Sequence, residues 1–195
     1  MAASAASRPY RIRHGELESL RADPRAWAVR RAGPAPWIRG GFSQAIRLAI
    51  YHFHATRDAA SARRHLAVIM ARLNLRNNAR RRDAGQQLDR YLSWFIQEQP
   101  IILARKLRVE LPLGRRAVFC GEIPRVDLDR RTGSYRAVLL GDIRAGWQDE
   151  LRMPLLQRAA ARKMQRDEEE FIIGVQALDG SAEPVNNFET LTVRI

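Results

Sequence analysis

The sequence predicts a single α+β domain, in which a mixed β-sheet carries helices on its faces. Apolar residues recur at helical spacing in the first half of the chain, the period changes to about two near residue 100, and one helical segment separates the third and fourth strands. A strand–helix–strand crossover within one sheet makes its two strands parallel. A chain of 195 residues with 46% hydrophobic residues is long enough for one core and short for two domains.

The helical part is predicted over residues 15–99, after a flexible N-terminus over residues 1–14. Proline disfavours a helix at the residue before it, so Asp23-Pro24 should divide the first two short helices. Three longer helices each show one apolar face, and residues 74–82 are expected to form a basic loop between the last two. The expected helices are residues 16–22, residues 25–31, one from Phe42, one from an N-cap at Asp58, and one that follows residue 82 and ends before Pro100.

The sheet core is predicted over residues 100–195 as a three-strand antiparallel meander, a crossover helix and a parallel strand, with a final strand at an edge. Gly133 lies in the turn between the second and third strands, where a glycine supplies positive φ. The expected elements are strands over residues 103–111, 117–128 and 135–143, a helix over residues 148–165, and strands over residues 171–177 and 188–195.

The charge is strongly positive and unevenly distributed. The chain holds 34 Lys and Arg against 21 Asp and Glu, a formal net charge of +13. Residues 1–100 contain 18 arginines and 7 acidic residues, a net charge of +11, whereas residues 101–195 are close to balance. Such charge favours polyanionic partners because neutralised phosphates release counterions, although an acidic protein surface would satisfy the same electrostatics. The helical half is therefore predicted to face the polyanion.

Cys120 is the only cysteine, which excludes a disulfide within the chain, a four-cysteine zinc site and a four-cysteine iron–sulfur cluster. No apolar run approaches the roughly 18–20 residues that a membrane span needs. We therefore expect a cytoplasmic protein that has no iron–sulfur cluster and no membrane partner.

The phrases GEIPRVDLDRRTGSYRAVLL and DELRMPLLQRAAA resemble the RecB-like branch of the PD-(D/E)XK nuclease superfamily. The phrases ELESLRADPRAWAVRR and GGFSQAIRLAIYHF are similar to the opening helices of the same branch, so the resemblance spans roughly residues 12–180. It implies a restriction-endonuclease-like core and, in an active member, Mg²⁺-dependent cleavage of DNA.

The sequence departs from the family at the positions that carry its chemistry. Pro124 stands where the family has a metal-binding aspartate, and Leu139 and Gly141 stand where it has Asp-x-Lys. The other replaced positions are Gln44 for a histidine, Asp23 for a cysteine, and Arg152 and Leu156 for a glutamine and a tyrosine. The resemblance therefore implies a degenerate catalytic site, for which no cofactor is expected.

A rearranged catalytic site of Glu122, Asp142 and Arg144 is the alternative, because Asp142 and Arg144 share a strand face and Glu122 lies on the neighbouring strand. Glu122 and Asp142 would then bind Mg²⁺ as hard oxygen ligands, and Arg144 would hold a phosphate, since arginine cannot act as a base. If these residues have no catalytic role, Asp142 and Arg144 are expected to form an ion pair at the end of a strand. Glu122, Asp127 and Asp129 are then expected to be solvated near the hairpin.

Arginines in the helical half that have few acidic neighbours are predicted to contact phosphate. The alternative is that they only form a solvated helix face. Trp37 and Trp27 are flanked by arginines and are candidates for stacking on bases. The predicted nucleic-acid-binding residues are Arg30, Arg31, Arg39, Arg63, Arg64, Arg72, Arg76, Arg80, Arg81, Arg82 and Trp37.

The leading hypothesis is a catalytically degenerate nuclease-like domain that binds nucleic acid, with DNA favoured over RNA, or that acts as a structural subunit beside other proteins. Bacterial DNA processing and defence against mobile DNA, such as CRISPR systems and other phage defence, are the settings that the resemblance implies. The alternatives are an active magnesium-dependent DNA nuclease with migrated residues, and a protein-interaction scaffold that docks an acidic partner.

Overall fold

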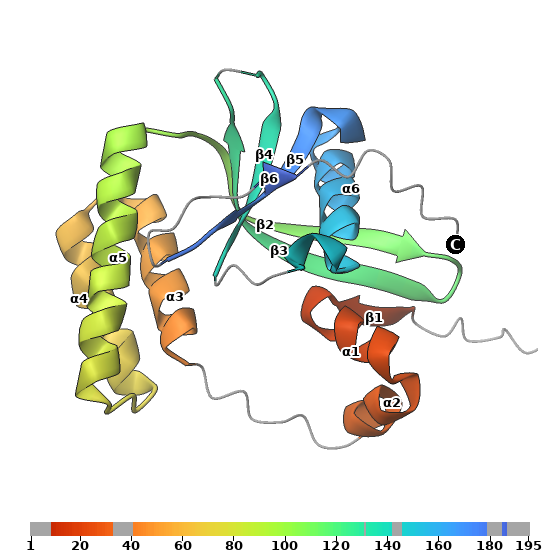
Figure 1. The fold of residues 1–195 in the computed structure, drawn as a ribbon, viewed down its shortest axis with the longest axis horizontal. Helices are drawn as coiled ribbons and strands as arrows, with labels where there is room; N and C mark the ends of the chain where they lie inside the picture. Colours follow the sequence, from red (N-terminus) through yellow and green to blue (C-terminus); the bar gives the residue numbers. More distant parts are fainter. Residues whose placement is uncertain (1–8, 33–40, 131, 142–145, 179–184, 187–195) are drawn as a thin grey trace, which may run out of the picture.

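The computed structural model describes residues 9–32, 41–130, 132–141, 146–178 and 185–186. Figure 1 shows a mixed sheet with helices α3, α4 and α5 on one side and helix α6 on the other. One buried cluster of apolar side chains lies between the sheet and α6, and a second lies between the sheet and α3–α5. The α+β class with a mixed sheet is therefore confirmed.

Strand β3 is the centre of the sheet topology. It pairs antiparallel with β2 along one edge, and along the other edge it pairs parallel with β1 and then antiparallel with β4. The β4–β5 pair is parallel, as the crossover through α6 predicts, and β6 pairs antiparallel with β5. The strands are β1 Tyr10–Arg13, β2 Ile101–Leu113, β3 Ala117–Leu128, β4 Tyr135–Leu140, β5 Phe171–Gln176 and β6 Val185–Asn186.

The helices begin and end close to the predicted signals. Asp58 is the N-cap of α4 and accepts a hydrogen bond from the backbone N–H of Ser61, and the extended Asp23 divides α1 from α2. The helices are α1 Leu17–Ala22, α2 Pro24–Ala32, α3 Phe42–Thr56, α4 Ala59–Arg72, α5 Asn78–Glu98 and α6 Arg152–Met164, with short 3₁₀ turns η1 His14–Glu16, η2 Trp147–Asp149 and η3 Glu168–Glu170. None of the helices in the described ranges is long and apolar enough to cross a membrane.

Two of the predicted boundaries are wrong. Residues 1–14 were expected to be flexible, whereas Tyr10–Arg13 form β1 beside the first half of β3. Residues 74–82 were expected to be a loop, whereas α5 begins at Asn78, because the side chain of Asn77 caps the backbone N–H of Arg80. The strand predicted over residues 188–195 and the last residues of the one predicted over 135–143 lie outside the described residues.

Strand β3 changes the face it presents to α6 at a kink formed by Lys106 and Pro124. The register of β2 with β3 places these two residues opposite each other, and Lys106 has a φ of 49°. Strict alternation would put Ile123 and Val126 on opposite faces, but both belong to the core beside α6. Proline cannot donate a ladder hydrogen bond, so the pairing is interrupted here. The Lys106–Pro124 kink therefore turns the following residue, Arg125, toward α3–α5.

Gly121 lets α6 approach β3 closely. A methyl group on Gly121 would lie 2.5 Å from Cδ2 of Leu156 and 3.2 Å from Cγ2 of Val109. We expect Gly121→Ala to lower the free energy of unfolding by about 1–3 kcal/mol in urea denaturation, because the buried side chain of Leu156 must move within a packed core. Gly85→Ala in α5 is the control, since an added methyl there meets no atom within 4 Å and should stabilise the helix by up to about 1 kcal/mol. Unchanged stability of Gly121→Ala would contradict the prediction.

Candidate functional site

A cleft with a volume of about 500 Å³ opens between α3 and the beginning of α6. Helix α3 forms one wall with Gln44, Arg47, Leu48 and Tyr51, which recur at three- and four-residue spacing on one face. The floor comes from β3, β4 and β5, and η2 with the start of α6 forms the far wall. This cleft is the candidate functional site, because it combines buried apolar surface with several charged groups.

Four of the seven positions singled out by the resemblance line this cleft, namely Gln44, Pro124, Leu139 and Arg152, whereas Asp23, Gly141 and Leu156 do not. Pro124 on β3 and Leu139 on β4 stand at positions where the resemblance implies metal ligands. Glu122, the first residue of the alternative catalytic set, lines it as well. Asp142 and Arg144 lie outside the described residues. The structure therefore places Glu122 in the cleft and leaves its two predicted companions undescribed.

Glu122 is held by two neighbouring side chains. The hydroxyl of Tyr51 donates to Oε1 of Glu122 at 3.2 Å, and Nε of Arg108 lies 3.7 Å from Oε2. Burial, reinforced by the charge of Glu122, raises the pKa of Tyr51, so the hydroxyl stays protonated and remains a donor. The second carboxylate of the cleft, Glu150, forms an ion pair with Arg152.

The described donors of the cleft do not by themselves suit a divalent cation. Mg²⁺ prefers several converging oxygen ligands. Glu122 and Glu150 are each engaged by an arginine, and the described ranges contain no group of three His, Cys, Asp or Glu residues that could hold a metal. Glu122 could supply one ligand, and Asp142 is the predicted second.

Positive charge enters the cleft from three elements. Arg47 comes from α3, Lys106 from β2 and Arg152 from α6. The ammonium of Lys106 lies 5.5 Å from the ring centre of Tyr51, within the range of a cation–π contact. Burial lowers the pKa of His14 below its ordinary value, and the charges of Arg152 and Arg47 lower it further. His14 is thus neutral near pH 7, and the cations of the cleft are its arginines and its lysine.

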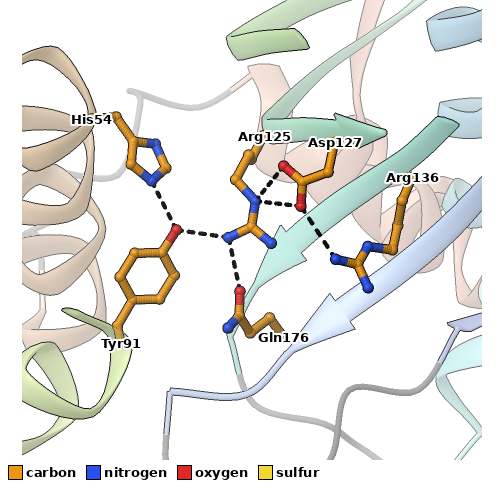
Figure 2. Close-up of polar contacts among 6 residues, drawn as sticks. All are labelled: His54, Tyr91, Arg125, Asp127, Arg136 and Gln176. Atoms are coloured by element: carbon orange, nitrogen blue, oxygen red, sulfur yellow. Dashed lines mark hydrogen bonds and ion pairs between the residues drawn. The ribbon is translucent and has the colours of Figure 1, made fainter. Parts of the chain in front are cut away.

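A buried polar network lies on the other side of the kink, between the sheet and α3–α5 (Figure 2). Nε of Arg125 donates to both carboxylate oxygens of Asp127 at 2.7 Å, and its NH1 donates to the hydroxyl of Tyr91 and to Oε1 of Gln176. His54 contacts the same Tyr91 hydroxyl through Nε2 at 2.8 Å. The network joins α3, α5, β3 and β5, and we interpret it as structural.

Asp127 corrects a prediction. It was expected to be solvated near the hairpin, but Asp127 and Arg125 are both 0% exposed. Burial raises the pKa of Asp127 although Arg125 and Arg136 act against the rise. The guanidinium of Arg125 also lies 4.7 Å from the ring centre of Trp94. The signal for this network is an Arg-x-Asp pair inside an apolar strand, where charged residues need buried partners.

Five of the predicted phosphate-binding arginines gather where α4 ends and α5 begins. We call Arg72, Arg76, Arg80, Arg81 and Arg82 the turn cluster; all five are exposed, and none forms an ion pair with another described residue. Their arrangement follows from the early start of α5, which puts three of them in its first turns.

The other predicted arginines are more constrained. Nε of Arg63 lies 2.7 Å from Asp89, and Arg64 lies 3.8 Å from Asp58. Arg31 donates to Glu16 and to the backbone carbonyl of Arg11. These contacts leave the turn cluster as the densest exposed charge among the predicted residues that the structure describes.

Arg31 fixes α2 against β1. Its guanidinium lies 4.9 Å from the ring centre of Tyr10 and 5.3 Å from that of Trp27. Trp27, a predicted stacking residue, is therefore already covered on one side by an arginine. Arg30 is exposed on α2, and Trp37 and Arg39 lie outside the described residues.

Comparison with known proteins assigns no family. No family model matches the chain, and no curated protein matches it. Among solved structures, the crystal structure of SSO0001 aligns with 96% of this chain and 70% of its own length, at 8% sequence identity and a TM-score of 0.35. A likeness at this level carries no argument about fold family or function.

Proposed function

We propose that this chain is a nucleic-acid-binding domain with a nuclease-like core whose cleft has lost its catalytic set. The turn cluster carries the proposal, since it presents five exposed arginines without ionic partners among the described residues. Arginine binds phosphate through paired N–H donors, and contacts of this kind do not depend on base sequence. The domain would serve other subunits of a DNA-processing or defence complex by holding the strand.

The loss of catalysis is supported by the chemistry of the cleft. Pro124 and Leu139 cannot bind a metal, and Glu122 is engaged by Tyr51 and Arg108. A cleft with more cations than free carboxylates suits the binding of phosphate better than the activation of water.

The turn cluster can be tested by charge reversal. We expect the triple variant Arg80→Glu, Arg81→Glu, Arg82→Glu to weaken binding to single-stranded and duplex DNA at least tenfold at about 50 mM salt. The dependence of log K on log salt should become shallower by about 2–3 for duplex DNA, because three phosphate contacts are lost. Fluorescence anisotropy over a salt series measures both. Glutamates in the first turns of α5 favour the helix, so the variant should fold.

A second triple variant controls for net charge. Arg115, Arg116 and Arg130 are exposed in the turns that follow β2 and β3, and their reversal changes the total charge equally. It should alter affinity only about two- to threefold, through long-range electrostatics. The proposal would be overturned if both triple variants lost DNA affinity equally, or if the parent protein did not bind DNA at low salt.

The non-catalytic part has its own test. Plasmid and linear single strands are incubated with the protein in Mg²⁺ or Mn²⁺, and no cleavage is expected. Cleavage that disappears in Asp142→Ala would instead establish the active nuclease with migrated ligands. The alternative of a protein-interaction scaffold would be favoured if an acidic protein still co-purified after nuclease treatment and the chain did not bind DNA.

A further inference from the structure

We propose that the cleft between α3 and α6 binds the phosphate of a nucleotide without a divalent cation, using Arg47, Lys106 and Arg152 in its place. This inference rests on the proposed function, because it assigns the nucleotide-binding chemistry of the same domain to a second site. It concerns residues that stand apart from the turn cluster, so the two sites can be tested separately.

Lys106 lines the cleft at the Lys106–Pro124 kink. It is one of two lysines in the chain, and it adopts a left-handed backbone conformation with a φ of 49°. That conformation disfavours a residue with a Cβ, and it lies opposite the proline that replaces the expected metal ligand. The ammonium group of Lys106 therefore lies at the position in the cleft where the resemblance implies a carboxylate.

Two cations of the cleft have no ion-pair partner among the residues that the structure describes. Glu122 is engaged by Arg108 and Tyr51, and Glu150 is paired with Arg152. Neither Arg47 nor Lys106 forms an ion pair with any residue that the structure describes. Both are exposed at the edge of the same cleft, where their like charges add to a positive potential that attracts an anion. A phosphate supplies that anion.

The other surfaces of the cleft suit the rest of a nucleotide. Leu48, Leu139, Leu140 and Val175 give it an apolar surface beside the cations. Its volume of about 500 Å³ falls in the range of small-molecule sites and can take a base and a sugar together with a phosphate. Gln44 lies on the same wall as Arg47 and provides an amide for the polar edge of a base. Inorganic phosphate alone would leave the apolar surface unused.

The test measures binding of thymidine 5′-monophosphate to the full chain by isothermal titration calorimetry, with EDTA and then with Mg²⁺. We expect equal affinity in both conditions, and at least tenfold weaker binding of thymidine, which lacks the phosphate. Arg47→Gln should weaken nucleotide binding several-fold, and Arg47→Gln with Lys106→Gln at least tenfold. Arg105→Gln is the matched control on the same strand as Lys106 and should keep nucleotide affinity within about twofold, because Arg105 is exposed and does not line the cleft.

The source of the phosphate is distinguished by competition. A 5′-phosphorylated oligonucleotide that competes better than its 5′-hydroxyl counterpart identifies a strand end, and equal competition identifies a phosphodiester within the strand. Competition by neither identifies a free nucleotide. Each of these results supports the inference.

Two results would overturn it, and both differ from failure of the proposed function. Nucleotide binding that requires Mg²⁺ would show that a metal, rather than Arg47 and Lys106, holds the phosphate. Absence of nucleotide binding, while the turn cluster still binds DNA, would leave the proposed function intact and remove the cleft from it. The triple variant of the turn cluster should bind the mononucleotide as the parent does. Circular dichroism and thermal unfolding confirm that each variant is folded.

Discussion

Arg125→Met is expected to lower the free energy of unfolding by about 3–5 kcal/mol, because it leaves the carboxylate of Asp127 buried without its main partner. Both residues are 0% exposed, so water cannot replace the lost contact. The hydroxyl of Tyr91 and the amide of Gln176 lose a charged donor at the same time. Urea denaturation followed by circular dichroism measures the change.

Removing both charges should restore most of the loss. Burial raises the pKa of Asp127, which means that the folded protein disfavours its charged form despite the neighbouring arginines. The double variant Arg125→Met, Asp127→Leu removes this cost and should unfold within about 1–2 kcal/mol of the parent protein.

Arg105→Met controls for the loss of an arginine from the sheet. Arg105 pairs with Arg125 in the register of β2 and β3 but is exposed, so its replacement should change stability by less than about 0.5 kcal/mol. A double variant as unstable as Arg125→Met would contradict the prediction and show that the hydrogen bonds to Tyr91 and Gln176 dominate.

Acid should destabilise the protein through His54. Burial lowers the pKa of His54 from 6.5 to about 3, and the charges of Arg125, Arg57 and Arg105 contribute to the fall. The unfolded chain binds a proton at this histidine below about pH 6.5, whereas the folded protein stays neutral there until about pH 3. The stabilising contribution is therefore fully present above about pH 6.5 and is lost progressively as the pH falls.

The expected loss between pH 7 and about pH 4.5 is about 2–3 kcal/mol from this group, on the basis of 1.36 kcal/mol per pKa unit. Other groups also titrate, so the measurement is a comparison of the parent with His54→Gln. In urea unfolding at several pH values, the free energy of unfolding of the parent should fall more steeply with decreasing pH than that of His54→Gln. His52→Gln on the same helix is the control, and its free energy of unfolding should fall as steeply as that of the parent. Parallel curves for the parent and His54→Gln would contradict the assignment.

The sheet and the main helices could be predicted from the sequence because their apolar periods are long and unbroken. Strand β3 begins and ends at the predicted residues, and α4 begins after the predicted cap at Asp58. Strand β1 could not be predicted, because only Ile12 of its four residues is buried and its partner lies more than a hundred residues away. The start of α5 was missed because a run of arginines was interpreted as a loop, although arginine favours helix and Asn77 is a good cap.

The candidate site could be predicted only in part, because its residues come from segments that are distant in sequence. Glu122 was predicted because it lies on the strand next to Asp142 and Arg144, and the structure puts it in the cleft. Lys106 was not predicted as part of the site, because its contact with Tyr51 joins two segments that are distant in sequence. Arg125 was not singled out either, since its role depends on Tyr91 and Gln176, which are distant in sequence. Pairing between distant segments is set by tertiary packing, which local patterns do not encode.

Strand β3 contacts both helical layers, and this should determine how the protein unfolds. The strand contributes Phe119 and Ile123 to the apolar layer against α6, and through Arg125 it holds Tyr91 of α5 on the opposite side. It also pairs with β1, β2 and β4, which are separated along the chain. Neither helical layer can therefore detach without exposing a strand on which the other depends. The chain should lose its structure in one cooperative step, and local opening should be confined to segments that do not touch β3.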